Sequence, residues 1–277
     1  MSSPDRYAVI GHPVGHSRSP FIHARFAAQT AQPLDYTTID AAPDEFGQVV
    51  REFFAHGGKG LNVTVPHKQA AASLVDALTP RARRAGAVNT LALRKEGGLL
   101  GDNTDGAGLA RDLVNNHGIS IAGRRVLLLG AGGAARGVLA PLLGLRPSQL
   151  CIVNRNVARA HELVEAFSDM GLLTALGYAD LGDETWDIVI NATAASLAGD
   201  LPPLPPGIVS AQSICYDLAY ARDETPFVHW AHQRGVARAI DGLGMLVEQA
   251  AESFHLWRGV RPDTASVLSA LAANLRA

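Results

Sequence analysis

Two hydroxyl side chains, two positions apart, are the first candidates for chemistry. Ser17 and Ser19 stand in the segment HSRSP, directly after a strand-like run and a loop of Gly and Pro. In an extended segment this spacing puts both hydroxyls on one face, where they could bind a carboxylate. Pro20 suits the first turn of a helix, so we expect Ser19 to cap that helix at its positive end. Taken alone, a helix cap without a ligand is the simpler interpretation.

A lysine at the start of a predicted helix is the second candidate. The segment NVTVPHK ends at Lys68, and its Asn62 and Thr64 share one face of the preceding strand. Lys68 would lie in the first helical turn, where the positive end of the helix dipole disfavours a cation. That position suits acid–base chemistry, although on this segment alone a surface lysine at a helix start is the better interpretation.

Further polar residues lie at the ends of two predicted strands. Asn89 stands in AVNT, and Asp102 and Asp105 stand in GDNTDG. Because ligands of α/β proteins bind at the carboxyl ends of strands, these side chains are candidates for the same site. The same residue types are also common in ordinary turns.

A glycine-rich turn comes after the apolar run of residues 125–130. It consists of Gly130, Ala131, Gly132, Gly133 and Ala134. Glycines here let the backbone approach a pyrophosphate, and the next helix offers its N–H groups to the phosphates. The flanking strand and helix favour a dinucleotide site over an ordinary turn.

The end of the next predicted strand indicates which dinucleotide would bind. An NAD site usually has a carboxylate there, which accepts hydrogen bonds from the ribose 2′-hydroxyl. This chain has Asn154, Arg155 and Asn156, with Arg159 one turn later. Since a guanidinium can bind a 2′-phosphate in a bidentate way, the sequence favours NADP over NAD. The alternative is that both arginines are merely solvated.

The elements that must position these residues alternate along the chain. We expect strands at residues 7–10, 35–39, 60–65, 87–93, 99–102, 125–130, 150–153, 186–191 and 213–217. We expect helices at residues 20–31, 46–56, 66–78, 106–117, 134–143, 157–167, 244–255 and 265–275. This alternation is typical of an α/β protein with mostly parallel sheets.

Composition and charge narrow the classes of partner. The chain has 277 residues, 47% hydrophobic and 18% charged, which excludes a disordered protein. With 24 Lys and Arg against 26 Asp and Glu it has no basic excess, so we expect no nucleic-acid partner. The densest basic cluster, Arg81, Arg83 and Arg84, is interpreted as a solvated helix end. No run is long and apolar enough for a signal core or a membrane span, so a cytoplasmic protein is expected.

The two cysteines, Cys151 and Cys215, form no disulfide framework and stand in apolar strands. They are expected to be buried small hydrophobes. The histidines show no accompanying Cys/His ligand cluster, so no metal is expected.

Taken together, these segments resemble the shikimate dehydrogenase family, whose members reduce 3-dehydroshikimate to shikimate with NADPH. The resemblance covers essentially the whole chain, and its order and spacing are specific. The matching segments are HSRSP, GKGLNVTVPHK, AGAVNT, GDNTDG, LGAGGAARGV, NR with the later Arg159, and DGLGMLVEQA. It implies an α/β substrate domain with a mostly parallel sheet, formed by residues 1–104 and 245–277. A Rossmann-type NADP-binding domain of residues 105–244 is inserted, and the C-terminal helices return to the first domain.

The resemblance also implies roles for individual residues. Lys68 and Asp105 match the catalytic pair. The positions that match substrate-binding residues are Ser17, Ser19, Thr64, Asn89, Tyr220 and Gln249. The positions that match cofactor-binding residues are Gly130, Ala131, Gly132, Gly133, Ala134, Asn154, Arg155, Asn156, Arg159, Leu218 and Gly242.

Four positions depart from the family pattern. Asn156 stands where the family usually has Thr, which puts the details of 2′-phosphate binding in doubt. Ala194 and Ala195 replace common serines, and Leu218 replaces a frequent Met.

Three alternatives stay open. A quinate/shikimate dehydrogenase with broader substrate or cofactor use is the nearest. A non-catalytic NADP-binding regulator would be expected to lose Lys68 or Asp105, and a folate or amino-acid dehydrogenase gives no reason for the serine pair. Family members occur as monomers and as homodimers, so either state is expected.

Overall fold

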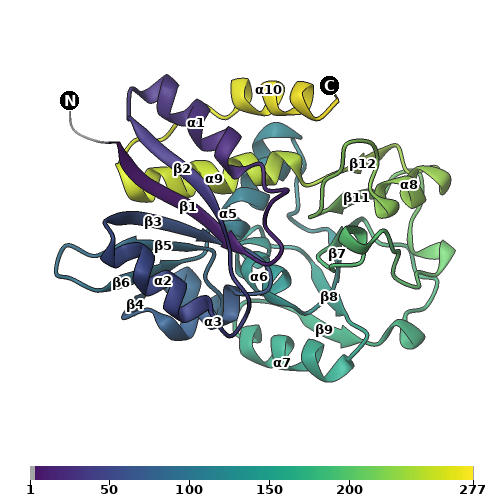
Figure 1. Ribbon diagram of the computed structural model, residues 1–277. Coiled ribbons are helices and arrows are strands. Elements are labelled where there is room, and N and C mark those ends of the chain that lie inside the picture. The colour runs from purple at the N-terminus through teal and green to yellow at the C-terminus, as the bar shows by residue number, and fades with distance from the viewer. Residues whose placement is uncertain (1–3, 277) are drawn as a thin grey trace. The chain divides into compact units, whose positions relative to one another are not determined.

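The computed structural model describes residues 4–276, except for the side chain of Leu197, and contains two six-stranded sheets (Figure 1). Each sheet belongs to its own compact unit. The first unit comprises the residues up to Gly108 together with Leu246–Asn274, and the second comprises Leu109–Met245 together with the residues from Leu275 on. Residues 1–3 and 277, which the expected substrate domain includes, lie outside the described residues.

The first sheet has the strand order β2-β1-β3-β5-β6-β4. Its strands are β1 (Asp5–Gly11), β2 (Leu34–Asp40), β3 (Gly58–Val63), β4 (Ala77–Leu78), β5 (Thr90–Leu93) and β6 (Leu99–Asp102). β1 runs parallel to β2 and β3, whereas β5 is antiparallel to β3 and β6. β5 and β6 therefore form a hairpin, and the sheet is mixed but mostly parallel.

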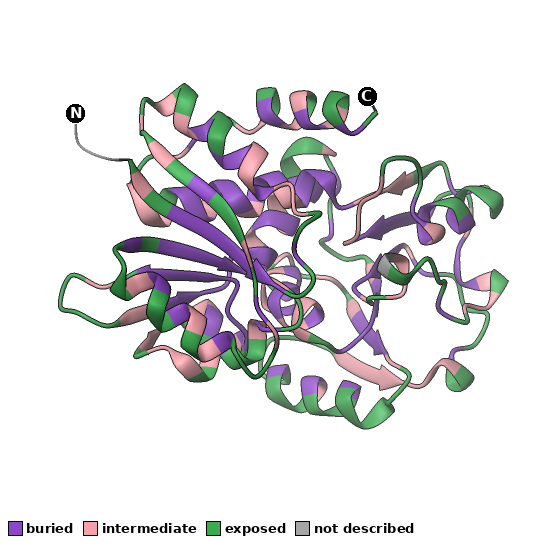
Figure 2. Ribbon diagram, in the orientation of Figure 1, coloured by how far each residue is buried: buried purple, intermediate pink, exposed green. Residues whose placement is uncertain are grey.

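Helices cover both faces of this sheet. They are α1 (Ser19–Thr30), α2 (Phe46–Ala55), α3 (Lys68–Leu74), α4 (Pro80–Ala85), α9 (Leu243–Arg258) and α10 (Ala265–Arg276). Successive side chains of a strand point to opposite faces. Ala8 accordingly belongs to the buried cluster that includes Phe46 of α2, while Tyr7 packs with Trp257 of α9. Figure 2 shows β1 and β3 buried along most of their length.

The second sheet is wholly parallel and has the strand order β12-β11-β10-β7-β8-β9. Its strands are β7 (Arg125–Leu129), β8 (Gln149–Val153), β9 (Leu173–Leu176), β10 (Ile188–Asn191), β11 (Ile214–Asp217) and β12 (Arg238–Ile240). Its helices include α5 (Asp105–Arg111, starting in the first unit), α6 (Gly133–Gly144), α7 (Val157–Phe167) and α8 (Pro226–Gln233). This order, with a reversal between β7 and β10, is that of a Rossmann fold. The predicted fold class is therefore confirmed.

Several expected elements were wrong in extent. The helix expected at 66–78 is only α3, because Val75 is extended and Ala77–Leu78 pairs with β6. The helix expected at 106–117 is α-helical only to Arg111 and continues as one π-helical turn over Asp112–Asn116. Strands β9 and β12 and helix α8 were not predicted. Within residues 4–276 there is no helix with the length and apolar character needed to cross a membrane.

Candidate active site

A lysine and an aspartate from two helix starts form an ion pair in the first unit. Lys68 lies in the first turn of its helix, as predicted, but is the first residue of α3, and its Nζ donates to Oδ2 of Asp105 at 2.6 Å. Asp105 is the first residue of α5, directly after the loop that follows β6. The side chains are 16% and 6% exposed, so water screens their interaction only in part. A partly buried, charge-assisted bond of this kind holds the amine in one place.

Asn89 fixes the other oxygen of Asp105. Its Nδ2 lies 2.8 Å from Asp105 Oδ1, and its Oδ1 accepts a hydrogen bond from the backbone N–H of Thr104 at 2.9 Å. Gln249 of α9 comes close to the same amide, with Oε1 3.3 Å from Asn89 Nδ2. The structure thus brings together four of the residues predicted for the site, from α3, α5, α9 and the loop before β5.

The two serines also meet, but not in the predicted way. Ser17 Oγ donates to Ser19 Oγ at 3.2 Å and accepts from the backbone N–H of Ser19 at 3.3 Å. The expectation that Ser19 caps α1 was wrong, since Arg18 is the cap residue and Ser19 is the first helical residue. Arg18 has helical dihedral angles (φ −90°, ψ 0°), so the chain between the serines is not extended. A tight turn into α1, not strand alternation, therefore brings the hydroxyls together.

Thr64 lies just beyond β3, against the end of β1. Its backbone N–H donates to Ile10 O at 2.9 Å. A Cβ on Gly11 would come within 2.4 Å of Thr64 Cγ2, so only glycine lets these two strand ends approach so closely. Thr64 is half-buried, four positions before Lys68.

A buried ion pair that was not predicted supports the segment leading to Asp105. Arg81 Nε and Nη2 donate to the two oxygens of Asp102 at 2.7 and 2.5 Å, and Thr79 Oγ1 donates to the same carboxylate at 2.6 Å. Burial alone would raise the pKa of Asp102, but Arg81 and Thr79 outweigh it and lower that pKa. The interpretation of Arg81 as part of a solvated helix end was wrong. Arg81 and Asp102 come from different elements, α4 and β6, so no local sequence pattern predicts that they pair. The only signal in the sequence is their opposite charge.

Asp102 also acts on its own loop. Its Oδ1 accepts from the backbone N–H of Asn103 at 2.8 Å, and Asn103 Oδ1 accepts in turn from the N–H of Asp105 at 3.2 Å. Asn103 Nδ2 donates to Ala87 O at 2.9 Å. These bonds set the position from which the Asp105 carboxylate reaches Lys68.

In the second unit, the glycine-rich turn has the geometry of a phosphate-binding loop. Gly130 has φ +103°, and a Cβ there would lie 3.0 Å from the backbone oxygen of Ala192. A Cβ on Gly132 would meet no atom within 4 Å. α6 begins at Gly133, and no side chain caps its N-terminus within the described residues. The first N–H groups of a 12-residue helix therefore remain available to an anion.

The strand end after β8 carries the two exposed arginines Arg155 and Arg159. Asn156 caps α7, because its Oδ1 accepts from the backbone N–H of Ala158 at 3.1 Å. Asn154 Nδ2 donates to Asn156 O at 2.8 Å and so closes the turn. Asn156 therefore fills the capping role that a threonine could also fill.

An arginine from α6, which the sequence did not single out, reaches toward the helix that follows this strand end. Arg136 stands in the first turn of α6, and its Nη2 is 3.6 Å from Glu162 Oε2 of α7. Its Nε is buried and has no partner among the described residues. An orphaned cationic donor at a helix start suits an anionic ligand.

Leu218 and Gly242 lie side by side, although they are far apart in sequence. The N–H of Gly242 donates to Ala219 O at 2.9 Å, and a Cβ on Gly242 would come within 2.3 Å of Leu218 O. Tyr220 follows in the same loop and is half-buried.

The carboxylate of Asp217, at the end of β11, anchors the start of that loop through hydrogen bonds. Its oxygens accept from Asn191, Ser196 and Thr225 at 3.0, 2.6 and 2.7 Å, and burial raises its pKa.

The predicted residues thus divide between the two units. Ser17, Ser19, Thr64, Lys68, Asn89, Asp105 and Gln249 belong to the first unit. Tyr220 and the predicted cofactor positions belong to the second. No group of three or more His, Cys, Asp or Glu within residues 4–276 is arranged to hold a metal ion.

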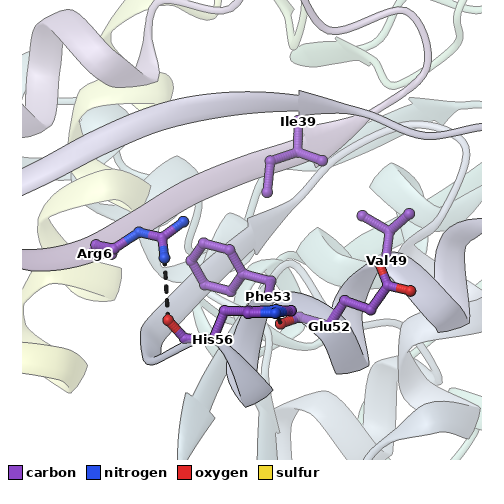
Figure 3. A pocket seen from close by; sticks show the side chains of 6 residues that line it. All are labelled: Arg6, Ile39, Val49, Glu52, Phe53 and His56. Atoms are coloured by element: carbon purple, nitrogen blue, oxygen red, sulfur yellow. Dashed lines mark hydrogen bonds between the residues drawn. The ribbon is translucent and has the colours of Figure 1, made fainter.

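A separate cavity of about 370 Å³ contains none of these residues (Figure 3). It is lined by Arg6, Ile39, Val49, Glu52, Phe53 and His56.

Family models match most of the chain. The shikimate dehydrogenase substrate binding domain matches residues 9–91. A shikimate / quinate 5-dehydrogenase model matches residues 109–199, and a shikimate 5′-dehydrogenase C-terminal domain matches residues 242–272.

Individual proteins match over nearly their whole length. The shikimate dehydrogenase (NADP(+)) of Aeromonas salmonicida is 58% identical, with 98% of each chain covered. The crystal structure of an Ael1 enzyme from Pseudomonas putida is 47% identical, with a TM-score of 0.89 over 96% of this chain and 98% of that one. The shikimate 5-dehydrogenase of Thermus thermophilus, solved with NADP(H) and shikimate, is 33% identical, with a TM-score of 0.85 over 98% and 99%. The resemblance inferred from the sequence is confirmed, and the chain belongs to the shikimate dehydrogenase family.

Proposed function

We propose that this chain catalyses the reversible reduction of 3-dehydroshikimate to shikimate with NADPH. The observation that carries the proposal is the ion pair between Lys68 and Asp105, held by Asn89 in the unit that also contains the paired serines. Curated relatives that span the whole chain are named for this activity, which supports the same conclusion.

Lys68 would exchange the proton of the reaction. Bound NADPH would supply the hydride that reduces the substrate carbonyl. As its oxygen gains negative charge, the Lys68 ammonium stabilises that charge and donates a proton from Nζ. Asp105 keeps the ammonium in place and accepts a hydrogen bond from the neighbouring substrate hydroxyl. In the direction of oxidation, neutral Lys68 accepts the proton of the substrate hydroxyl.

The remaining residues of the first unit would bind and orient the substrate. Ser17 and Ser19 present two hydroxyls 3.2 Å apart, which suits the two oxygens of a carboxylate. Thr64, Asn89 and Gln249 would hydrogen-bond the ring hydroxyls, and Tyr220 would add a further substrate contact. The near-neutral charge of the chain fits this scheme, because a few placed groups suffice to hold a small anion.

The second unit would hold NADP. The open turn at Gly130, Ala131 and Gly132 and the uncapped start of α6 at Gly133 and Ala134 fit a pyrophosphate. Arg155 and Arg159 would bind the 2′-phosphate, with Asn154 and Asn156 shaping the turn between them. Leu218 and Gly242 would form the apolar, close-packed side of the cofactor site.

The proposal extends to the organisation of the protein. We assign substrate binding to residues 1–104 and 245–277 and NADP binding to residues 105–244, except that Asp105, at the boundary, belongs to the first unit and acts on the substrate. Cys151 and Cys215 are buried and unpaired, which suits the reducing cytoplasm. Both a monomer and a homodimer are compatible with the proposed site, and sedimentation analysis of the purified protein would distinguish them.

A steady-state assay of the purified protein tests the function. Shikimate and quinate are each supplied with NADP⁺ and with NAD⁺, and reduction of the nicotinamide is followed by absorbance. We expect the highest kcat/KM with shikimate and NADP⁺. Comparable values with quinate or NAD⁺ would instead indicate the broader quinate/shikimate enzyme, and no turnover with shikimate and NADP⁺ would refute the proposal.

A further inference from the structure

Four uncharged side chains form a buried polar layer in the first unit, defined here as Tyr36, Asn62, Thr90 and Ser253. They come from β2, β3, β5 and α9, and they are 8%, 6%, 0% and 0% exposed. None of them was singled out as a ligand of substrate or cofactor. Buried polar groups are costly unless they are hydrogen-bonded, so the partners of this layer show what it supports.

At one end the layer meets the paired serines. The Tyr36 side chain lies next to Ser19. The Tyr36 hydroxyl donates to Asn62 Oδ1 at 2.7 Å, and this bond is buried. Ser19 therefore borders the side chain that holds the Asn62 amide.

In the middle the layer crosses from strand to helix. Asn62 Nδ2 donates to Ser253 Oγ at 2.9 Å and lies 3.2 Å from Thr90 Oγ1. The Thr90 and Ser253 hydroxyls are 2.7 Å apart, so the three side chains form a closed triangle of hydrogen bonds. A closed set of this kind allows little independent motion of its members.

At the other end the layer meets the residues around the ion pair. Thr90 Oγ1 donates to Asn89 Oδ1 at 2.9 Å, and Asn89 Nδ2 in turn lies 2.8 Å from Asp105 Oδ1. Asp105 then holds Lys68 through its other oxygen. A continuous hydrogen-bonded path thus runs from Tyr36, which lies next to Ser19, through the rest of the buried polar layer to Lys68.

The surroundings keep this layer uncharged. The His23 ring stacks on Tyr36 at a centroid distance of 4.2 Å, and burial lowers the His23 pKa to about 3. Trp257 and Phe254 complete the apolar enclosure of His23. Hydrogen bonds in such a dry, neutral setting are stronger than those at the surface. The layer can therefore fix the distances between the side chains that it joins.

We propose that Tyr36, Asn62, Thr90 and Ser253 are positioning residues. The layer holds the hydroxyls that bind the substrate carboxylate at a fixed distance from the amine that exchanges the proton. This inference rests on the proposed function of the chain. None of the four side chains needs to touch the substrate, because each acts through Ser19 or through Asn89.

The first test replaces Tyr36 by phenylalanine. Tyr36→Phe keeps the ring that stacks on His23 but leaves Asn62 Oδ1 without its O–H donor. We expect kcat/KM for shikimate to fall about tenfold or more, with a lower kcat and a higher KM for shikimate. The KM for NADP⁺ is expected to stay within about twofold, because the cofactor residues belong to the other unit.

Tyr7→Phe is the matched control. Tyr7 is a 3%-exposed tyrosine of the same sheet that also packs on Trp257, but its hydroxyl contacts Arg258 and not Asn62. Loss of its hydroxyl is expected to leave the shikimate kinetics within about twofold of wild type. A purely structural role for Tyr36 would lower the Tm and leave kcat and KM of the folded protein like those of the control.

Ser253→Ala tests the middle of the layer and keeps the inference testable if Tyr36→Phe fails to fold. It removes the partner shared by Asn62 and Thr90, and the same kinetic pattern is expected. An inactive wild-type protein would refute the proposed function and this inference together. An active wild type, with both variants as fast as Tyr7→Phe, would refute the inference alone.

Discussion

Lys68 Nζ and Asp105 Oδ2 lie 2.6 Å apart, and the second oxygen of Asp105 is taken up by the amide of Asn89. Each oxygen of the carboxylate thus has its own donor, so the carboxylate cannot rotate without breaking a bond. The lysine approaches from α3 and the aspartate from α5, and both residues begin their helices. This arrangement makes Lys68 the group whose loss should affect the reaction most directly.

Lys68→Ala is expected to abolish turnover, because no other amine would donate the proton from that position. NADP⁺ affinity, measured by fluorescence titration, should stay nearly unchanged. Lys59→Ala removes an exposed lysine from β3 and is the control. Turnover of Lys68→Ala within about tenfold of wild type would refute the role assigned to Lys68.

Arg155→Ala should impair the use of NADP⁺ far more than that of NAD⁺. The guanidinium is exposed at the strand end where a 2′-phosphate would bind, and NAD⁺ has no such phosphate. We expect the KM for NADP⁺ to rise at least about tenfold, since a charge-assisted contact is lost. Arg234→Ala, which removes an exposed arginine at the end of α8, should change neither value. Equal effects on both cofactors would contradict this assignment.

Arg81→Met should destabilise the protein by about 3 kcal/mol at pH 7, because the Asp102 carboxylate is left buried without its cation. This is the low end for such pairs, since Arg81 itself is 36% exposed. The free energy of unfolding is measured by urea titration, with Arg83→Met on the same helix as the control. A loss equal to that of the control would show that the pair does not stabilise the fold.

The same pair predicts a pH dependence. The pKa of Asp102 is lowered in the folded state, so its contribution to stability is present above the unfolded pKa of about 3.9. It is lost as the pH falls through the lower, folded value. The stability difference between wild type and Arg81→Met should therefore shrink as the pH is lowered from 7 to below 4.

His23 predicts a pH dependence in a higher range. Burial lowers its pKa from 6.5 to about 3, so between these values the unfolded chain binds a proton that the folded chain does not. The contribution of neutral His23 to the free energy of unfolding is fully present above pH 6.5. It declines as the pH falls from 6.5 toward 3. At pH 5 the loss is about 2 kcal/mol, which His23→Phe should remove.

The check compares urea titrations of wild type and His23→Phe at pH 8 and pH 5. His255→Phe, which replaces an exposed histidine of α9, should keep the pH dependence of wild type. If His23→Phe lost as much stability on acidification as wild type does, His23 could not be the buried neutral group described here.

Local sequence patterns predicted much of the second unit correctly. α7 was expected at residues 157–167 and spans Val157–Phe167, since its capping residue and its apolar spacing are both local features. The turn at Gly130 was equally recognisable, because a positive φ favours glycine wherever it occurs. The strands β9 and β12 were missed because they lie at the sheet edges and are short, with weak apolar patterns.

In the first unit, local patterns were less reliable. The continuous helical pattern of residues 66–78 hid a helix end at Leu74, because pairing of Ala77–Leu78 with β6 outweighed helix propensity. The hydroxyls of Ser17 and Ser19 were expected to lie close together, and they do. The expected cause, an extended segment, was wrong. A two-residue spacing alone cannot distinguish a strand face from a turn into a helix.

The sequence by itself determined which residue types are available for the site and in what order they occur. Glycine turns, helix starts and strands could be predicted because each depends mainly on neighbouring residues. Only the tertiary structure decided which of these residues meet. Asn89 and Gln249 are 160 positions apart, and Asn62 and Ser253 are 191 apart. Their contacts follow from the return of α9 to the first sheet, where each buried polar group must find a partner. For the same reason Asp102 pairs with Arg81 and leaves Asp105 for Lys68.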